Sequence, residues 1–382
     1  MIIKQLEANI IKNSRNEDAI EIIINKRYKA STPSGASTGT HEIKAFPRQG
    51  IKKVISFINK HKNIWIDKEF NNFNDLKHFE ELIQDLGGNT VIALQLAVLK
   101  AMSNNKIYSF LNPKAKKLPT PLGNCIGGGS HTKLKSTDIQ EFLLIPTAQT
   151  FEEKVKINKH IHKELRKKLK TNKLNDEGAI IPNLSTEETL DFLYNFLKDK
   201  NNTLGYKVSI GLDLAASEFY NKTYNYKNFS KENKRLKLQM LEQISLMNEW
   251  IKTYKIAYLE DPLEQEDFKG FSKINKKTLV CGDDLTTTNL ERLKIALKTK
   301  AINAIIIKPN QIGSLNKTKE VVDYAHKNKI TTIISHRSGE TLDASIAHLA
   351  VAWNIPYIKT GIYGKEREAK LKELIKIEKK IK

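Results

Sequence analysis

The feature that most constrains the fold is a set of short apolar runs, each ending in a charged residue or histidine, in the second half of the chain. These runs end at Asp213, Glu260, Asp283, Lys308, His336 and Lys359. From Glu260 onward the ends are separated by 23, 25, 28 and 23 residues, which is the length of one strand plus one helix. The stretches between them, such as 289–298 and 318–326, have helical periodicity. We therefore expect parallel strands that are buried on both faces.

The length of the chain is consistent with a closed barrel and a smaller second domain. The chain has 382 residues, more than the roughly 250–300 at which a single hydrophobic core usually stops growing. A segment rich in proline and lysine, 112–121, predicts the domain boundary. It would separate an α+β capping domain over 1–112 from an α/β barrel over 118–382, close to the roughly 250 residues of a TIM barrel.

The capping domain carries its own pattern. Strands and helices are expected at 20–24, 28–31, 51–59 and 90–103, on either side of a small-residue loop at 31–40. That loop is rich in serine, threonine and glycine, so it could close over a site, although an ordinary surface turn has the same composition. The fold class is therefore α/β, with the capping domain preceding the barrel.

Composition excludes several classes of protein. No run approaches the roughly 18 uncharged apolar residues that span a bilayer, and a glutamate at position 7 interrupts any signal peptide. A cytoplasmic protein is expected. The two cysteines, Cys125 and Cys281, are far apart and lack a metal-binding pattern, which favours buried, reduced thiols over a disulfide or zinc site.

The formal net charge of +21 leaves two interpretations open. A strongly basic chain can bind nucleic acid or anionic membranes. Here the lysines are spread over helical segments such as 154–173 and 365–382, and no basic motif is interleaved with aromatic residues. We expect a solvated basic surface that also helps to capture an anionic substrate, without a dedicated nucleic-acid site.

Three of the strand ends carry carboxylates, Asp213, Glu260 and Asp283. In a TIM barrel the ends of the strands meet at one mouth, so these side chains would share a pocket. Like charges in a partly desolvated pocket raise one another's pKa or require a cation. Oxygen ligands favour a hard ion, Mg²⁺ before Mn²⁺ or Ca²⁺. The alternative is that each acid pairs with a nearby lysine or caps the following helix.

The next strand ends suggest a base and an anion site. Lys308 and Lys359 would lie beside each other and the metal, which would lower the affinity of an ammonium group for its proton and allow it to act as a base. The alternative is a salt bridge facing solvent. His336, Arg337 and Ser338 precede a helix and suit phosphate binding, although a lone His-Arg pair is weak evidence.

The sequence resembles the enolase family along nearly all of its length. The similar segments, in the family's order, are 33–39, 128–131, 140–142, 176–178, 212–220, 259–262, 282–286, 307–313, 335–341 and 358–361. The resemblance implies a cytoplasmic hydro-lyase of glycolysis and gluconeogenesis that converts 2-phosphoglycerate to phosphoenolpyruvate. Enolases are known to use a lysine base together with magnesium, and the resemblance implies the same pair in this chain.

The resemblance also implies the metal ligands. Asp213, Glu260 and Asp283 would bind a first Mg²⁺, with Glu260 and Asp283 also bordering the substrate. Ser37, on the small-residue loop, would join the substrate phosphate in binding a second Mg²⁺, giving two ions per active site.

Roles in the chemistry follow from the same resemblance. Lys308 would take the C2 proton, and Glu177, placed with Glu141, would assist departure of the C3 hydroxide. His131 would close over the substrate.

The remaining residues would bind the substrate. Lys359 would contact its carboxylate, Arg337 and Ser338 its phosphate, and His336 would lie nearby.

The sequence departs from the family pattern in several places, among them the loop between His131 and Glu141, which has one extra residue. The segment 14–19 differs from the stretch that usually contributes to a dimer contact, so a homo-oligomer, dimer or higher, is expected without a fixed number of subunits. The connection after Glu42 is short, which indicates a trimmed capping domain. Asn175 replaces a glycine before the Asp-Glu-Gly motif and is expected to restrict the backbone that carries Glu177.

Two other functions remain open at this stage. Relatives with the same barrel and metal triad racemise, cycloisomerise or deaminate other carboxylates, although Ser37, Arg337 and Ser338 favour a phosphorylated substrate. A noncatalytic protein that binds nucleic acid or a surface would use the positive charge, but it would have no reason to keep Glu141, Glu177, Lys308 and Lys359 together.

Overall fold

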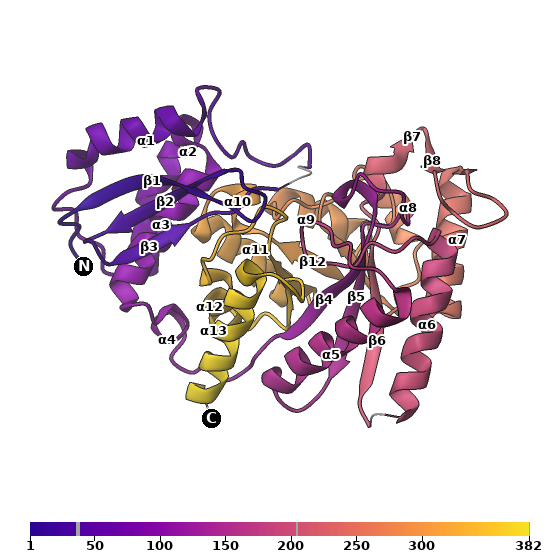
Figure 1. Cartoon of the computed structure of the whole chain (residues 1–382). Helices are drawn as coiled ribbons and strands as arrows, with labels where there is room; N and C mark the ends of the chain where they lie inside the picture. The colour runs from indigo at the N-terminus through magenta and orange to yellow at the C-terminus, as the bar shows by residue number, and fades with distance from the viewer. Residues whose placement is uncertain (36–38, 204, 382) are drawn as a thin grey trace.

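A closed barrel of eight strands forms the larger part of the computed structural model, which describes residues 1–35, 39–203 and 205–381. In Figure 1 the barrel lies on the right and the N-terminal sheet on the left. The barrel strands are β4 (Thr120–Gly127), β5 (Glu141–Thr147), β6 (Lys207–Asp213), β10 (Tyr258–Glu260), β11 (Leu279–Gly282), β12 (Ala304–Ile307), β13 (Thr331–Ser335) and β14 (Tyr357–Lys359). The expected α/β barrel is confirmed.

The strand directions differ from the expectation at one strand. The six runs identified in the sequence pair with one another in the parallel direction, as predicted. β5, however, is antiparallel to both β4 and β6, so a barrel of parallel strands throughout is wrong. The reason is the connection at 128–140, which contains only one short 3₁₀ turn. A chain that returns without a crossover helix can pair only in the antiparallel direction.

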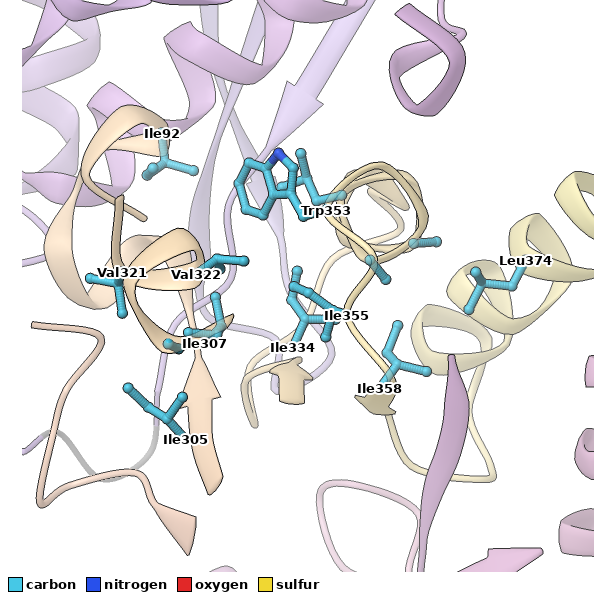
Figure 2. Packing of buried hydrophobic residues seen from close by; sticks show 14 of the residues in the cluster. Ile92, Ile305, Ile307, Val321, Val322, Ile334, Trp353, Ile355, Ile358 and Leu374 are labelled. Atoms are coloured by element: carbon cyan, nitrogen blue, oxygen red, sulfur yellow. The ribbon is translucent and has the colours of Figure 1, made fainter. Parts of the chain in front are cut away.

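The parallel strands are buried on both faces because their side chains alternate between two apolar layers. On β12, Ala304 and Ile306 point into the barrel, where they belong to a small interior cluster with Tyr258 and Cys281. Ile305 and Ile307 point the other way and belong to the main core, as Figure 2 shows. A continuous apolar run is therefore required at each strand.

Helices cover the outside of the barrel. They are α5 (Phe151–Leu169), α6 (Thr186–Thr203), α7 (Met240–Thr253), α8 (Phe268–Ser272), α9 (Leu290–Lys298), α10 (Pro309–Ile312), α11 (Leu315–Lys327), α12 (Ser345–Ala352) and α13 (Lys365–Ile381). α5 begins at a capping box formed by Thr150 and Glu153. The predicted helical segments 289–298 and 318–326 correspond to α9 and α11. In Figure 2, Val321 and Val322 of α11 and Leu374 of α13 belong to the layer between strands and helices.

The N-terminal part is an antiparallel sheet packed on helices. Its elements are β1 (Leu6–Lys12), β2 (Asp18–Ile24), β3 (Tyr28–Ser31), α1 (Gly50–Lys60), η1 (Lys62–Ile64), η2 (Phe73–Leu82), α2 (Ile83–Leu86), α3 (Gly88–Ser103) and α4 (Ile107–Leu111). The predicted strands and helices are present, and β1 was missed. α3 is buried on nearly all sides because it packs against this sheet and also against the barrel helix α10. The boundaries 1–112 and 118–382 stay a prediction.

A third, small sheet lies beside the barrel and was not expected from the sequence. It consists of β7 (Tyr220–Asn221), β8 (Thr223–Tyr226) and β9 (Leu236–Leu238), with the short η4 turn (Ala216–Phe219) before it. Cys125 and Cys281 are buried free thiols, as predicted. Within the described ranges, no helix is both long and apolar enough to cross a membrane.

Candidate active site

The register of the barrel brings three carboxylates side by side at one mouth. Glu141 is directly opposite Asp213 across β5 and β6, and Asp213 is paired with Glu260 across β6 and β10. Glu141 is the first residue of β5, so the antiparallel direction of that strand places it at the mouth where its neighbours end. All three side chains are buried.

Lys359, at the end of β14, lies among these carboxylates. Its Nζ is 2.7 Å from Asp213 Oδ2, 2.9 Å from Glu260 Oε2 and 3.0 Å from Glu141 Oε2. Burial opposes the charge on Lys359, but the attraction of Asp213, Glu141 and Glu260 outweighs it and raises the pKa of this lysine well above its ordinary value. Lys359 is therefore protonated.

Lys308, just after β12, contacts Asp283, just after β11. Burial again opposes the charge, and Asp283 outweighs burial, so the pKa of Lys308 is raised. The expectation that Lys359 and a bound metal together lower the pKa of Lys308 stays a prediction, and repulsion from Lys359 does act in that direction. Their mutual repulsion is present, but each ammonium also contacts at least one carboxylate, and the nearer opposite charge dominates.

The carboxylates exceed what the two lysines neutralise. Burial, followed by repulsion from Asp213, raises the pKa of Glu260 to about 8, and Glu260 Oε1 has no hydrogen-bond partner among the described residues. Burial, followed by Asp283, raises the pKa of Asp284 to about 7. Surplus buried oxygens of this kind fit a hard divalent cation.

The acidic side chains that lie closest together in this structure include Asp283 but not Asp213 or Glu260. Ligand atoms within 4.8 Å of one another are found in two groups of the described residues: Asp261, Asp283 and Asp284, and His131, Glu141 and Glu177. Asp213 and Glu260 instead direct one oxygen each at Lys359. Asp213, Glu260 and Asp283 can therefore bind one ion together only if Lys359 and Lys308 release these carboxylates.

Glu177 faces this cluster from the loop before α6. Asn124 Nδ2 donates a hydrogen bond to Glu177 Oε2 at 3.0 Å, and His336 Nε2 lies 3.7 Å from the same oxygen. His131 Nδ1 lies 3.7 Å from Glu177 Oε1. Asn124 of β4 and the two histidines thus converge on one carboxylate.

Glu141 and Glu177 behave as a pair. Burial dominates for Glu141 and raises its pKa well above the ordinary value, while a hydrogen bond to Glu177 and the charge of Glu177 add to the effect. Burial also opposes ionisation of Glu177, but nearby positive charge and the bond from Glu141 hold its pKa well below the ordinary value. The two opposite shifts favour a single proton shared by the pair, held more tightly by Glu141 than by Glu177.

The turn that carries Glu177 is built by Asn175. Its Oδ1 accepts hydrogen bonds from the backbone N–H of Glu177 at 3.0 Å and of Ala179 at 2.9 Å. The side chain of Asn175 therefore stabilises the turn. The expectation that Asn175 restricts the backbone carrying Glu177 stays a prediction. The left-handed position of the turn is Gly178, at φ 79°.

His162 on α5 supports the turn from behind and gives a test of pH dependence. Its Nε2 lies 3.1 Å from Gly178 O, and burial lowers the pKa of His162 to about 4. The unfolded chain, with a pKa near 6.5, therefore binds more protons between pH 6.5 and 4, and stability falls as the pH falls. Between pH 7 and 4.5, urea unfolding of the wild type should lose about 2 kcal/mol more than the His162→Gln variant. Equal losses in both proteins would contradict this role of His162.

Arg337, after β13, extends toward the capping domain. Its Nη2 lies 3.0 Å from Glu42 Oε2 and its Nη1 donates to Asn310 Oδ1 at 3.2 Å. The neighbouring Ser338 is buried at the same mouth, and both residues line the cavity there together with Lys308 and Lys359. That cavity measures about 40 Å³, so substrate binding requires these side chains to move apart.

Arg367 of α13 holds the backbone of this loop. It is almost fully buried, its Nη2 donates to Ser338 O at 2.6 Å, and its Nη1 donates to Ser14 Oγ at 2.7 Å. Ser14 Oγ in turn donates to Ser338 O at 3.0 Å. Arg367 is thus a positioning residue that fixes the segment bearing Arg337 and Ser338.

Replacement of Arg367 by methionine should raise KM more than it lowers kcat. Losing one hydrogen bond to a buried carbonyl costs about 1–3 kcal/mol, so KM for the substrate should rise about tenfold or more. Arg367→Lys, which keeps the charge but not the planar fork, should lie between the wild type and Arg367→Met. Steady-state kinetics with inorganic phosphate as a competitor would check this. A fall in kcat at unchanged KM would contradict it.

The sequence prediction missed several residues of this site. Gln140, which donates to Asp213 Oδ2 at 3.3 Å, Asn124 and Arg367 have no chemical pattern that separates them from other buried polar residues. The position of Glu42 at this site is evident only from its ion pair with Arg337 in the structure. The predicted Ser37 lies outside the described residues.

This chain is similar to known proteins of one family. The family model described as enolase, C-terminal TIM barrel domain, matches residues 115–382. A protein from Methanosphaera stadtmanae named enolase is 36% identical over all of this chain and 97% of its own length. Enolases from Methanothermobacter thermautotrophicus and Archaeoglobus fulgidus are each 38% identical, over 100% and 99% of this chain and 97% of their own lengths.

Proposed function

The chain belongs to the enolase family, and we propose how its residues carry out the family's reaction, the reversible dehydration of 2-phosphoglycerate to phosphoenolpyruvate. As an enolase it is a phosphopyruvate hydratase, a hydro-lyase. The observation that carries the proposal is the convergence of Lys308, Glu177 and a cluster of buried carboxylates on one cavity. The similarity to enolases over the full length decides against other substrates of the same barrel.

The metal is proposed to be Mg²⁺, two ions per active site. Asp213, Glu260 and Asp283 would hold the first ion, and Ser37 with the substrate phosphate the second. Bound magnesium would neutralise these carboxylates, release the lysines from them and stabilise negative charge on the substrate carboxylate. The partnerless oxygen of Glu260 supports this set.

Lys308 is proposed as the base. In the described structure it is protonated and contacts Asp283. When Lys308 is released from Asp283, burial and the nearby charges of Lys359 and Arg337 lower the affinity of its Nζ for a proton. Neutral Nζ can then take the C2 proton, leaving the electron pair on C2 next to the carboxylate.

Glu177 and Glu141 are proposed as the acid. The proton that the pair shares passes to the C3 hydroxyl, which leaves as water while the electron pair at C2 forms the C2–C3 double bond. Ionised Glu177, held by Asn124, positions the leaving group, and His131 closes over it. Base and acid thus act from different strands of one mouth.

Substrate binding is assigned to the cationic residues at the mouth. Lys359 would bind the carboxylate, and Arg337 with Ser338 the phosphate. His336 would stay neutral nearby, because burial lowers its pKa well below the ordinary value. Arg337 would have to leave Glu42, which links substrate binding to movement of the capping domain.

Location and assembly are proposed from the family and the composition. We propose a cytoplasmic homo-oligomer, dimer or higher, without a dedicated nucleic-acid site. Size measurement by mass photometry would test the assembly.

Magnesium removal tests the function directly. Formation of phosphoenolpyruvate, followed by its absorbance, should require Mg²⁺, fall to background with excess EDTA and return when Mg²⁺ is restored. The physical reason is that unneutralised Asp283 keeps Lys308 protonated. Activity of the pure protein that survives EDTA would contradict the proposal.

A further inference from the structure

A large cavity lies away from the catalytic mouth. It measures about 700 Å³ and is formed by α5, the loop that follows it, and the segment after β14. This volume is within the range typical of small-molecule sites. The turn carrying Glu177 separates it from the active site, since His162 and Tyr363 line the cavity and both contact Gly178.

One wall of this cavity is a basic stripe on α5. The stripe consists of Lys159, Lys163, Arg166 and Lys167, spaced so that they lie on one face of the helix, and of Lys170, which directly follows the last helical residue. Glu368 is the only acid of the lining, and it already pairs with Lys159 at 2.8 Å.

Two cations of the stripe are paired, Lys159 with Glu368 and Lys167 with Glu164 at 3.6 Å, and the other three have no ion pair within the described ranges. Among the described residues, Lys163 and Lys170 have no ion pair, and Arg166 donates only to the neutral amide of Asn172, at 3.0 Å. A cleft lined by one sign of charge concentrates ligands of the opposite sign. The ligand that this wall fits therefore carries several negative charges.

The opposite wall offers a flat aromatic surface. Tyr363 is 49% exposed, and its ring is stacked on His162 at 6.0 Å between centroids with the planes 12° apart. Gly178 fixes the backbone behind the ring, because a Cβ there would lie 2.7 Å from Tyr363 O. The stacked ring is thus held in place, and a planar heterocycle could stack on it.

We propose that this cavity, defined by the α5 basic stripe and Tyr363, binds a nucleoside triphosphate. The phosphates lie along Lys163, Arg166 and Lys170, and the base stacks on Tyr363. The site is separate from the catalytic mouth and goes beyond the proposed function.

Isothermal titration with ATP in excess Mg²⁺ tests the proposal. The double variant Lys163→Glu, Arg166→Glu should bind ATP at least tenfold more weakly than the wild type. The control Lys298→Glu, Lys300→Glu makes the same change in net charge on exposed residues of and after α9 and should bind within twofold of the wild type. Both double variants should keep the wild-type kcat, because none of the four residues is part of the catalytic machinery.

Further arms separate the possible origins of binding. Inorganic tripolyphosphate should bind more weakly than ATP to the wild type, and Tyr363→Ala should remove that difference. Competition by phosphoenolpyruvate would place ATP in the active site and overturn the proposal. The absence of ATP binding at millimolar concentration, equal weakening in both double variants, or tighter binding of mixed-sequence RNA through the same stripe would also overturn it.

Discussion

Lys308→Ala is expected to lower kcat for phosphoenolpyruvate formation by about 10³- to 10⁴-fold, the upper part of the range for general-base catalysis. The physical reason is that Nζ of Lys308 is the group placed to take the C2 proton, and alanine has no proton acceptor. KM should change much less, because Lys359 and Arg337 remain to bind the carboxylate and phosphate. A coupled steady-state assay at saturating Mg²⁺ measures both constants.

The controls for Lys308 separate chemistry from folding. Lys300→Ala removes an exposed lysine of the same barrel and should leave kcat unchanged. Circular dichroism should show the same helix content in both variants. A folded Lys308→Ala protein that keeps more than a tenth of the wild-type kcat would rule out Lys308 as the base.

Glu177→Gln is expected to lower kcat by about 10²- to 10⁴-fold, again the range for positioned proton transfer. Glutamine keeps the shape of the side chain and can still contact Asn124, but it cannot share a proton with Glu141. Departure of the C3 hydroxide then lacks the carboxylate that positions the leaving group and shares the proton with Glu141, while removal of the C2 proton is unaffected. Glu141→Gln should give a loss of the same order, since the pair acts as a unit.

The control for Glu177 is the partly exposed Glu164 on α5. Glu164 lies near Glu177 in the sequence but away from the mouth. Glu164→Gln makes the same chemical change as Glu177→Gln and should leave kcat unchanged. If Glu177→Gln loses no more activity than Glu164→Gln, the acid must be sought elsewhere.

The sequence predicted those parts of the fold that depend on local pattern. The barrel strands ending at Asp213, Glu260 and Lys359 were visible because burial on both faces demands a continuous apolar run. β1 and the β7–β9 sheet were missed, since one face of each is polar and their runs are short or mixed with asparagine and lysine. The direction of β5 was also hidden, because it depends on the connection 128–140 and not on the residues of the strand.

For the site, sequence pattern located the side chains but not their state. Asp213, Glu260 and Lys359 were predicted to meet, and the structure brings them together. Their pKa shifts depend on distances of a few ångströms across three strands, which no spacing along the chain encodes. The raised pKa of Lys308 beside Asp283 is one example.

Exchange of the C2 hydrogen of 2-phosphoglycerate with deuterated solvent, followed by proton magnetic resonance, tests most directly whether one mouth presents a lysine base and a separate carboxyl acid. The account predicts that the wild type exchanges and converts the substrate, that Glu177→Gln exchanges without converting, and that Lys308→Ala does neither. Exchange by Lys308→Ala at the wild-type rate, or its loss in Glu177→Gln alone, would contradict the assignment of base and acid.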